Sequence, residues 1–138
     1  MERYLLDTLY WLWLQKGDEH HVDSKKFKEV EEWQKRGSVY VSAISVWEIS
    51  YLVAAGTIHL DRSVEHWVES GTEDGGFQLL PLSTRVLIES SRLPDNPHGD
   101  PGDRLLMATA REYDLTIITR DKKILTYATK GHVKARKL

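Results

Sequence analysis

The sequence predicts an α/β fold, with a mostly parallel sheet that carries helices on both faces. Short apolar segments alternate along the chain with longer segments of helical periodicity, which is the order typical of parallel sheets. Residues 115–119 (Leu-Thr-Ile-Ile-Thr) are largely β-branched and apolar, as expected of a strand buried on both faces. A chain of 138 residues has the usual length of one domain, so we expect residues 1–138 to form one.

In the first half of the chain, glycines divide the expected elements. We expect strands at residues 3–7 and 39–41, and helices at 8–16, 22–36, 42–55 and 61–68. Gly17, Gly37 and Gly56 each follow a helical segment and favour its end. Asp61 is the expected N-cap of the fourth helix. Residues 71–76 are expected to form a loop.

In the second half, the clearest boundary is the start of one helix. We expect strands at residues 77–80, 115–119 and 132–133, and helices at 83–92, 100–113 and 122–128. Residues 93–102 hold three of the four prolines and form the longest irregular segment. Asp100 followed by Pro101 is a strong helix start, with the acid at the N-cap and proline at the first helical position.

Composition excludes several classes of protein. The chain has no cysteine, which rules out disulfides, thiolate zinc sites and a cysteine nucleophile. Its 41% apolar and 29% charged residues are ordinary for a globular domain. The first apolar run, residues 4–14, contains Asp7 and is too short to span a membrane. We therefore expect a cytoplasmic protein without a membrane partner.

Charge is distributed unevenly along the chain. The formal net charge is −2, but residues 104–138 carry nine Lys or Arg against three Asp or Glu. The basic end, residues 130–138, could meet phosphates. Charge alone is equally consistent with a solvated tail.

Four carboxylates stand where a functional site is expected. Asp7 ends the first expected strand, and Asp121 follows the strand containing Ile117 by a few residues. Ligands of open parallel sheets bind outside the carboxyl ends of the strands. Glu48 and Asp103 lie within helices, and their neighbours at helical spacing are mainly apolar, so we expect both on core-facing stripes. A carboxylate there is costly unless it is protonated, paired or bound to a cation.

Each acid also has a purely structural explanation. Ser45 and Glu48 have the spacing of a capping box, and Asp103 could complement the dipole of its helix. Asp7 and Asp121 could be capping or turn residues. All four being structural is much less probable than any one of them. Oxygen ligands without cysteine favour Mg²⁺ or Mn²⁺, and such ions suit hydrolysis of a phosphodiester by an activated water.

Four motifs contain these acids: Leu-Leu-Asp-Thr at 5–8, Ser-Ala-Ile-Ser-Val-Trp-Glu-Ile at 42–49, Asp-Pro-Gly-Asp-Arg-Leu-Leu-Met-Ala-Thr-Ala at 100–110, and Thr-Arg-Asp at 119–121. Together they resemble the motifs of PIN-domain ribonucleases, in particular of VapC-type toxins of toxin–antitoxin systems. Their order and spacing agree with the family from residue 4 to about residue 125. The resemblance implies a Rossmann-like sheet and a Mg²⁺- or Mn²⁺-dependent endoribonuclease, often a homodimer, silenced by a cognate antitoxin.

The resemblance also implies roles for individual residues. The metal-binding and catalytic acids correspond to Asp7, Glu48, Asp103 and Asp121. Asp100 corresponds to a helix cap that supports Asp103, and Thr119 to a hydrogen-bonding partner of a carboxylate or of substrate. Two positions depart from the family pattern: many relatives have a polar residue at Leu9 and an aromatic at Gly102. The second departure suggests a looser loop at the mouth of the site.

Other residues are candidates for substrate contact. Arg104, Arg120 and Lys122 flank the acids and could bind phosphates. His98 is near Asp103 in sequence and could reach substrate.

Two rival functions share this acidic set. One is a catalytically silent PIN fold that binds RNA or protein, and the other is a metal-dependent phosphodiesterase acting on DNA.

Overall fold

The computed structural model describes residues 1–97 and 99–138 and contains a five-stranded sheet. The strand order is β3-β2-β1-β4-β5, and each neighbouring pair is parallel. The strands are β1 (Tyr4–Leu6), β2 (Val39–Ser42), β3 (Gln78–Leu80), β4 (Thr116–Ile118) and β5 (Lys134–Arg136). The expected α/β fold with a mostly parallel sheet is confirmed.

The helices connect successive strands. They are α1 (Thr8–Lys16), α2 (Ser24–Lys35), α3 (Ala43–Ala54), α4 (Val64–Thr72), α5 (Thr84–Ser90), α6 (Pro101–Tyr113) and α7 (Lys122–Ala128). Four of these helices, α1, α2, α6 and α7, follow an aspartate N-cap whose side chain accepts a backbone N–H of the first turn. Helices α1, α6 and α7 have the expected bounds, whereas α2 begins after Asp23 and not at residue 22.

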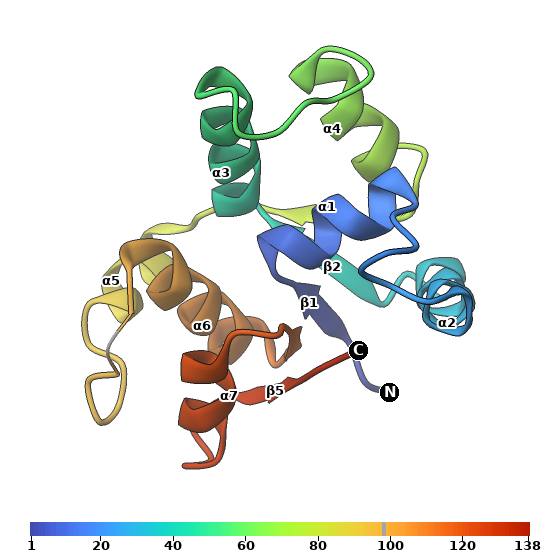
Figure 1. Ribbon diagram of the computed structural model, residues 1–138. Coiled ribbons are helices and arrows are strands. Elements are labelled where there is room, and N and C mark those ends of the chain that lie inside the picture. The colour runs from blue at the N-terminus through green and yellow to red at the C-terminus, as the bar shows by residue number, and fades with distance from the viewer. Residues whose placement is uncertain (98) are drawn as a thin grey trace.

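Helices cover both faces of the sheet (Figure 1). Helices α1, α2 and α4 pack on one face against Leu6, Val41 and Ile118, and Trp11, which is fully buried, lies in the same cluster. Helices α5, α6 and α7 pack on the other face, where a second buried cluster contains Leu5. Because neighbouring strand residues point to opposite faces, the three-residue β1 contributes to both cores. The sheet is therefore a layer between two hydrophobic cores.

Helix α4 begins and ends later than expected. Helix α4 begins after Ser63, whose hydroxyl accepts the His66 N–H, and not after Asp61, whose carboxylate pairs instead with Arg62. The helix also continues through Gly71, which is buried against Gln15, so the expected loop starts later.

The last strand also begins later in the sequence than expected. It is β5, Lys134–Arg136, rather than residues 132–133. This strand lies at the edge of the sheet and is basic, as edge strands often are. In the described part of the chain, no helix is both long and apolar enough to cross a membrane.

The chain order of the strands defines where a ligand site is expected. From β1, the chain adds β2 and then β3 on one side, and later adds β4 and β5 on the other side. The connections therefore reverse direction between β1 and β4, and the crevice at the carboxyl ends of such a pair is the usual ligand site of an open α/β sheet. Asp7 directly follows β1, and Thr119 directly follows β4.

Candidate active site

All four acids line one cavity at the carboxyl edge of the sheet. The cavity has a volume of about 350 Å³, and its lining includes Asp7, Glu48, Asp103 and Asp121. The four come from segments far apart in the sequence: the ends of β1 and β4, the middle of α3 and the first turn of α6. The structure thus brings together the residues that the sequence analysis singled out. Their roles as ligands or catalysts remain predictions.

Asp7 is held by contacts to both of its oxygens. Its Oδ1 accepts the Tyr10 N–H at 2.8 Å as the N-cap of α1, and its Oδ2 accepts the Thr119 hydroxyl at 2.6 Å. The Thr119 hydroxyl oxygen also accepts the Asp121 N–H at 3.0 Å. Thr119 is fully buried, so this one side chain connects the ends of β1 and β4 across the strand pair. The expected hydrogen bond from Thr119 to a carboxylate is present.

Asp121 is also a helix cap. Its Oδ1 accepts the Lys123 N–H at 2.7 Å at the start of α7. The capping explanation therefore holds for Asp7 and for Asp121. It accounts for only one oxygen of each side chain, and it leaves open why two caps should share a cavity with two further acids.

Glu48 caps no helix. Its Oε1 accepts the Thr8 hydroxyl at 2.9 Å, and that hydroxyl is 2.8 Å from the Ser45 hydroxyl. The expectation of a core-facing apolar stripe around Glu48 is wrong, since Tyr51 on the same face is 63% exposed. Helix α3 buries Ser45 and Ile49 instead, which turns Glu48 toward the cavity at its edge.

Asp103 lies on the buried stripe expected for it. Leu106, Met107 and Ala110 at helical spacing are all buried. Asp100 caps α6 as expected, since its Oδ1 accepts the Asp103 N–H at 2.8 Å. The acid of the first turn is thus placed by the acid that begins the helix.

Gly102 lets Glu48 come close to the start of α6. A Cβ atom at Gly102 would lie 3.4 Å from Glu48 Oε1 and 3.3 Å from Asp100 Oδ1. A larger side chain there would press on both carboxylates. The lack of a side chain at Gly102, where many relatives have an aromatic residue, therefore affects how closely α3 and α6 approach.

The environment of the acidic cavity disfavours the ionised form of its carboxyl groups. Burial raises the pKa of Asp7, Glu48 and Asp103 above the ordinary carboxyl range. For Asp103 the pKa rises to about 6, first through burial and then through the negative charges of Asp100 and the other three acids. In the described part of the chain, no ion pair joins any of the four carboxylates to Lys, Arg or His. A cation would relieve this repulsion.

The donor set fits a hard divalent cation in its chemistry. Carboxylate oxygens are the ligands that Mg²⁺ and Mn²⁺ prefer. Among residues 1–97 and 99–138, however, no three such side chains are already arranged around one ion position. Mg²⁺ usually keeps several waters and binds through one or two carboxylates together with substrate phosphate. The cavity therefore fits an ion held largely by water and substrate, and not a closed protein cage.

The three basic candidates for substrate contact lie in different places. Arg120 lines the cavity, with its guanidinium 4.8 Å from the Trp13 ring centroid and a donated hydrogen bond to the Tyr10 hydroxyl. Arg104 donates instead to the carbonyls of Ser90 and Pro97.

Lys122 lines a neighbouring groove. Contact with substrate remains a prediction for all three basic residues. His98 lies outside the described residues.

Sequence reasoning missed the hydroxyls that position the acids. It assigned no role to Thr8 and considered Ser45 only as part of a capping box, although Thr8 is buried and donates to Glu48. A signal existed for Thr8, because it follows Asp7 at the edge of the sheet where the site was expected.

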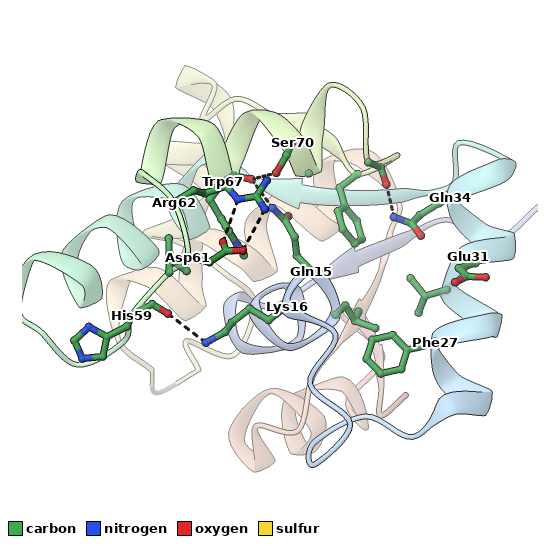
Figure 2. A pocket seen from close by; sticks show the side chains of 16 residues that line it. Gln15, Lys16, Phe27, Glu31, Gln34, His59, Asp61, Arg62, Trp67 and Ser70 are labelled. Carbon is green, nitrogen blue, oxygen red and sulfur yellow. Dashed lines mark hydrogen bonds and ion pairs between the residues drawn. The ribbon is translucent and has the colours of Figure 1, made fainter.

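A larger cavity lies elsewhere, between α1, α2 and α4 (Figure 2). Its volume is about 630 Å³, and its polar groups are largely paired. Arg62 forms an ion pair with Asp61 at 3.0 Å, and Lys16 donates to the His59 carbonyl at 3.3 Å. Size alone would select this cavity, but its described Lys, Arg, Asp and Glu side chains are two of each sign and include one ion pair.

A sequence model of the PIN domain matches residues 4–130, and the chain therefore belongs to the PIN-domain family. It is 30% identical over 87 residues to Ribonuclease VapC22 from Mycobacterium tuberculosis. That match covers 63% of this chain and 65% of the relative, which is slightly less than two thirds of the relative's length.

Two crystal structures have the same fold. The first is VapBC2 from Rickettsia felis bound to a promoter DNA fragment, with a TM-score of 0.70, 15% identity and 97% of each chain covered. The second is DNA-bound VapBC from Salmonella typhimurium, with a TM-score of 0.63 and 16% identity, covering 99% of this chain and 98% of that one. At these identities the similarity shows the fold.

Proposed function

We propose that this protein is a Mg²⁺- or Mn²⁺-dependent endoribonuclease and the toxin of a toxin–antitoxin pair. The observation that carries the proposal is the group of four carboxylates from separate segments that line one cavity and form no ion pair in the described chain. The similarity to a ribonuclease supports RNA as the substrate. We place the activity in the cytoplasm as part of the same proposal.

Each residue of the acidic cavity would have its own role in RNA cleavage. A bound divalent ion would polarise a phosphate oxygen and lower the pKa of a water. Asp7, Glu48, Asp103 and Asp121 would hold the ion and its waters. The Thr119 hydroxyl keeps Asp7 oriented, and the Thr8 hydroxyl keeps Glu48 oriented. Arg120 would contact the phosphate backbone at the edge of the cavity.

The direct test is RNA cleavage by Asp7→Asn and Asp103→Asn variants with Mg²⁺ or Mn²⁺ present. Both should fold and both should lose cleavage, while Asp61→Asn, in the larger cavity, should keep it. If both site variants cut RNA as well as the wild type, the nuclease proposal is wrong. Single-stranded DNA of the same sequence serves as the second substrate, and preferential cleavage of DNA would replace ribonuclease by deoxyribonuclease.

The silent-module alternative has one observation in its favour. The described carboxylates are not already arranged around a single ion position. A protein that only binds RNA or protein would need no such arrangement. The effect of Mn²⁺ on thermal stability separates the two functions, and the expected result is given in the Discussion.

A cognate antitoxin is the proposed protein partner. The structures with the same fold are described as VapBC assemblies, which supports a partner of this kind. An antitoxin segment that placed an arginine in the acidic cavity would compensate its negative charge. Expression of the chain alone should slow growth, and a small protein encoded beside it should relieve this effect. Normal growth at high levels of folded, active protein would contradict toxin status.

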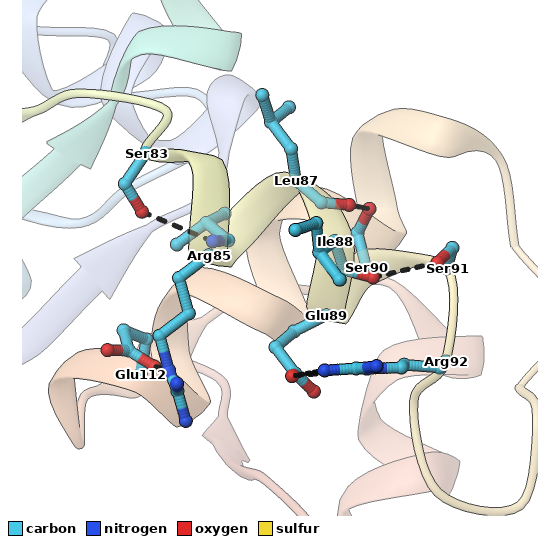
Figure 3. Close-up of polar contacts among 10 residues, drawn as sticks. Ser83, Arg85, Leu87, Ile88, Glu89, Ser90, Ser91, Arg92 and Glu112 are labelled. Atoms are coloured by element: carbon cyan, nitrogen blue, oxygen red, sulfur yellow. Dashed lines mark hydrogen bonds and ion pairs between the residues drawn. The ribbon is translucent and has the colours of Figure 1, made fainter.

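We also propose a homodimer, supported by exposed apolar side chains on α5. Leu87 and Ile88 are each 48% exposed, and Figure 3 shows them on the helix that also carries Glu89. Such side chains are candidates for burial against a second copy. The double variant Leu87→Glu, Ile88→Glu should be monomeric by light scattering, whereas Glu89→Gln on the same helix should not change the oligomeric state. A wild-type monomer would remove the dimer from the proposal.

A further inference from the structure

A groove lined by lysines runs beside the acidic cavity. It lies between α7 and the loop at residues 95–97, and its volume is about 490 Å³. Lys122, Lys123 and Lys130 line it, together with the polar side chains of Asn96 and Thr126. The groove is thus rich in groups that can donate hydrogen bonds to an anion.

Helix α7 separates this groove from the acids. Lys123 and Thr126 are three residues apart and share one face of α7, and Lys130 follows shortly after the helix ends at Ala128. Ile124, on another face of the same turn, lines the acidic cavity. Asp121, the N-cap, belongs to the acidic cavity, and the next residue, Lys122, belongs to the groove. The two sites are therefore adjacent along the first turn of α7.

The lysines of this groove differ from other basic residues of the C-terminal third. Lys134 pairs with Asp114 at 2.9 Å, and Arg136 lies 3.6 Å from Glu29. Within residues 1–97 and 99–138, no ion pair engages Lys122, Lys123 or Lys130.

One carboxylate, Asp95, also lines the groove, but it contacts His132 at 2.7 Å. The groove therefore brings together three lysines that form no ion pair in the described chain, with Asp95 as its one carboxylate.

We infer that this groove holds a single strand of RNA next to the phosphodiester that is cut, an inference that rests on the proposed ribonuclease function. A cavity of four carboxylates repels a polyanion, so affinity for the strand has to come from an adjoining cationic surface. Helix α7, from Lys122 to Ala128, extends about 9 Å at the helical rise per residue, and Lys130 follows its end. That length matches about three stacked nucleotides. The lysines would contact phosphates and leave sequence selection to other residues.

The test is the affinity of the protein for a labelled 12-nucleotide single-stranded RNA, measured by fluorescence anisotropy in EDTA so that no cleavage occurs. The variant Lys122→Gln, Lys123→Gln, Lys130→Gln should bind roughly tenfold more weakly at low salt. The slope of log K against log salt should also become shallower by about 2, from about 0.7 for each lost phosphate contact.

The matched control removes three lysines from α2: Lys25→Gln, Lys28→Gln, Lys35→Gln. These residues are exposed on a helix that lines neither the groove nor the acidic cavity. The control should keep wild-type affinity and salt slope. Equal weakening in both triple variants would reduce the effect to net charge, and unchanged binding in the groove variant would overturn the assignment. Tighter binding of DNA of the same sequence would overturn RNA as the occupant.

Two further measurements keep this inference separate from the proposed function. Ultraviolet crosslinking of wild-type protein to the RNA should label peptides from residues 95–97 and 122–130, and labels confined to other segments would contradict the groove. Cleavage with Mg²⁺ is measured independently. If the wild type binds RNA through the groove but never cuts it, the nuclease proposal fails and the groove stands.

Discussion

The two main cavities of this protein differ in how their charges are balanced. The larger one, between α1, α2 and α4, contains Asp61, but Arg62 pairs with it and the pKa of Asp61 is lowered by that contact. The smaller one contains four carboxylates, and the pKa of Asp103 there is raised to about 6. Cavity size is therefore a poor guide to function in this molecule. Charge that the fold brings together and leaves uncompensated is the better guide, because it is unfavourable without a ligand.

The largest expected effect is a loss of catalysis. It is tested by removing one carboxylate from each cavity and comparing the rates. Glu48→Gln should lower the rate of RNA cleavage by about 100-fold or more, since ion binding is worth several kcal/mol in the transition state. Glu31→Gln, in the larger cavity, should change the rate by less than about twofold. Initial rates at saturating Mg²⁺ check both values. Equal losses in the two variants would remove the distinction between the cavities.

The next effect is the response to metal and its dependence on pH. Mn²⁺ should raise the melting temperature of the wild type at pH 8, because it binds only the folded cavity. Since the pKa of Asp103 is about 6, protons compete with the ion below that pH, and the shift should shrink as the pH falls from 7 to 5. Asp103→Asn should abolish most of the shift. No shift at pH 8 would favour the silent-module alternative.

A smaller effect is expected from the residue that connects β1 and β4. Thr119→Val keeps the shape but removes the hydroxyl that donates to Asp7 and accepts from the Asp121 N–H. We expect about tenfold slower cleavage, as for other residues that orient ligands. Stability should fall by about 1–3 kcal/mol, because buried polar groups lose their partner. Ser70→Ala, which removes a hydroxyl from the larger cavity, should leave cleavage unchanged. A Thr119→Val enzyme of normal activity would contradict the positioning role.

The smallest effect concerns stability without metal, and it should have opposite signs in the two cavities. At pH 8, Asp103→Asn should raise the melting temperature slightly, because it removes a carboxylate whose charge is unfavourable in the folded state. The gain should shrink as the pH falls through about 6, where the wild-type carboxyl becomes protonated in the folded state. Asp61→Asn should lower the melting temperature slightly, because Arg62 stabilises the charge of Asp61 in the folded state. Chemical denaturation in EDTA at pH 5 and pH 8 measures these differences.

The expected and observed elements agree where a single capping residue marks the start of a helix. Helices α1, α6 and α7 begin after Asp7, Asp100 and Asp121, where one good cap has no close competitor. At α4 two capping residues stand two positions apart, and the ion pair of Asp61 with Arg62 leaves the cap to Ser63. Strand β5 was misplaced because its polar sequence becomes a strand only through pairing with β4. Such pairing is a tertiary effect that local propensity does not contain.

The residues of the candidate site were predictable from local features of the sequence, but their arrangement was not. The four acids were identifiable because two end strands and two interrupt apolar helical spacing, features that are local in the chain. Their common cavity depends on the parallel order β2-β1-β4, which only the fold decides. The burial of Thr8, the approach of Glu48 to Gly102 and the lysine groove beside α7 likewise depend on contacts between distant segments. Sequence by itself determined which side chains can bind a cation, and the tertiary structure decided which of them meet, because long-range packing sets distances that residue types cannot.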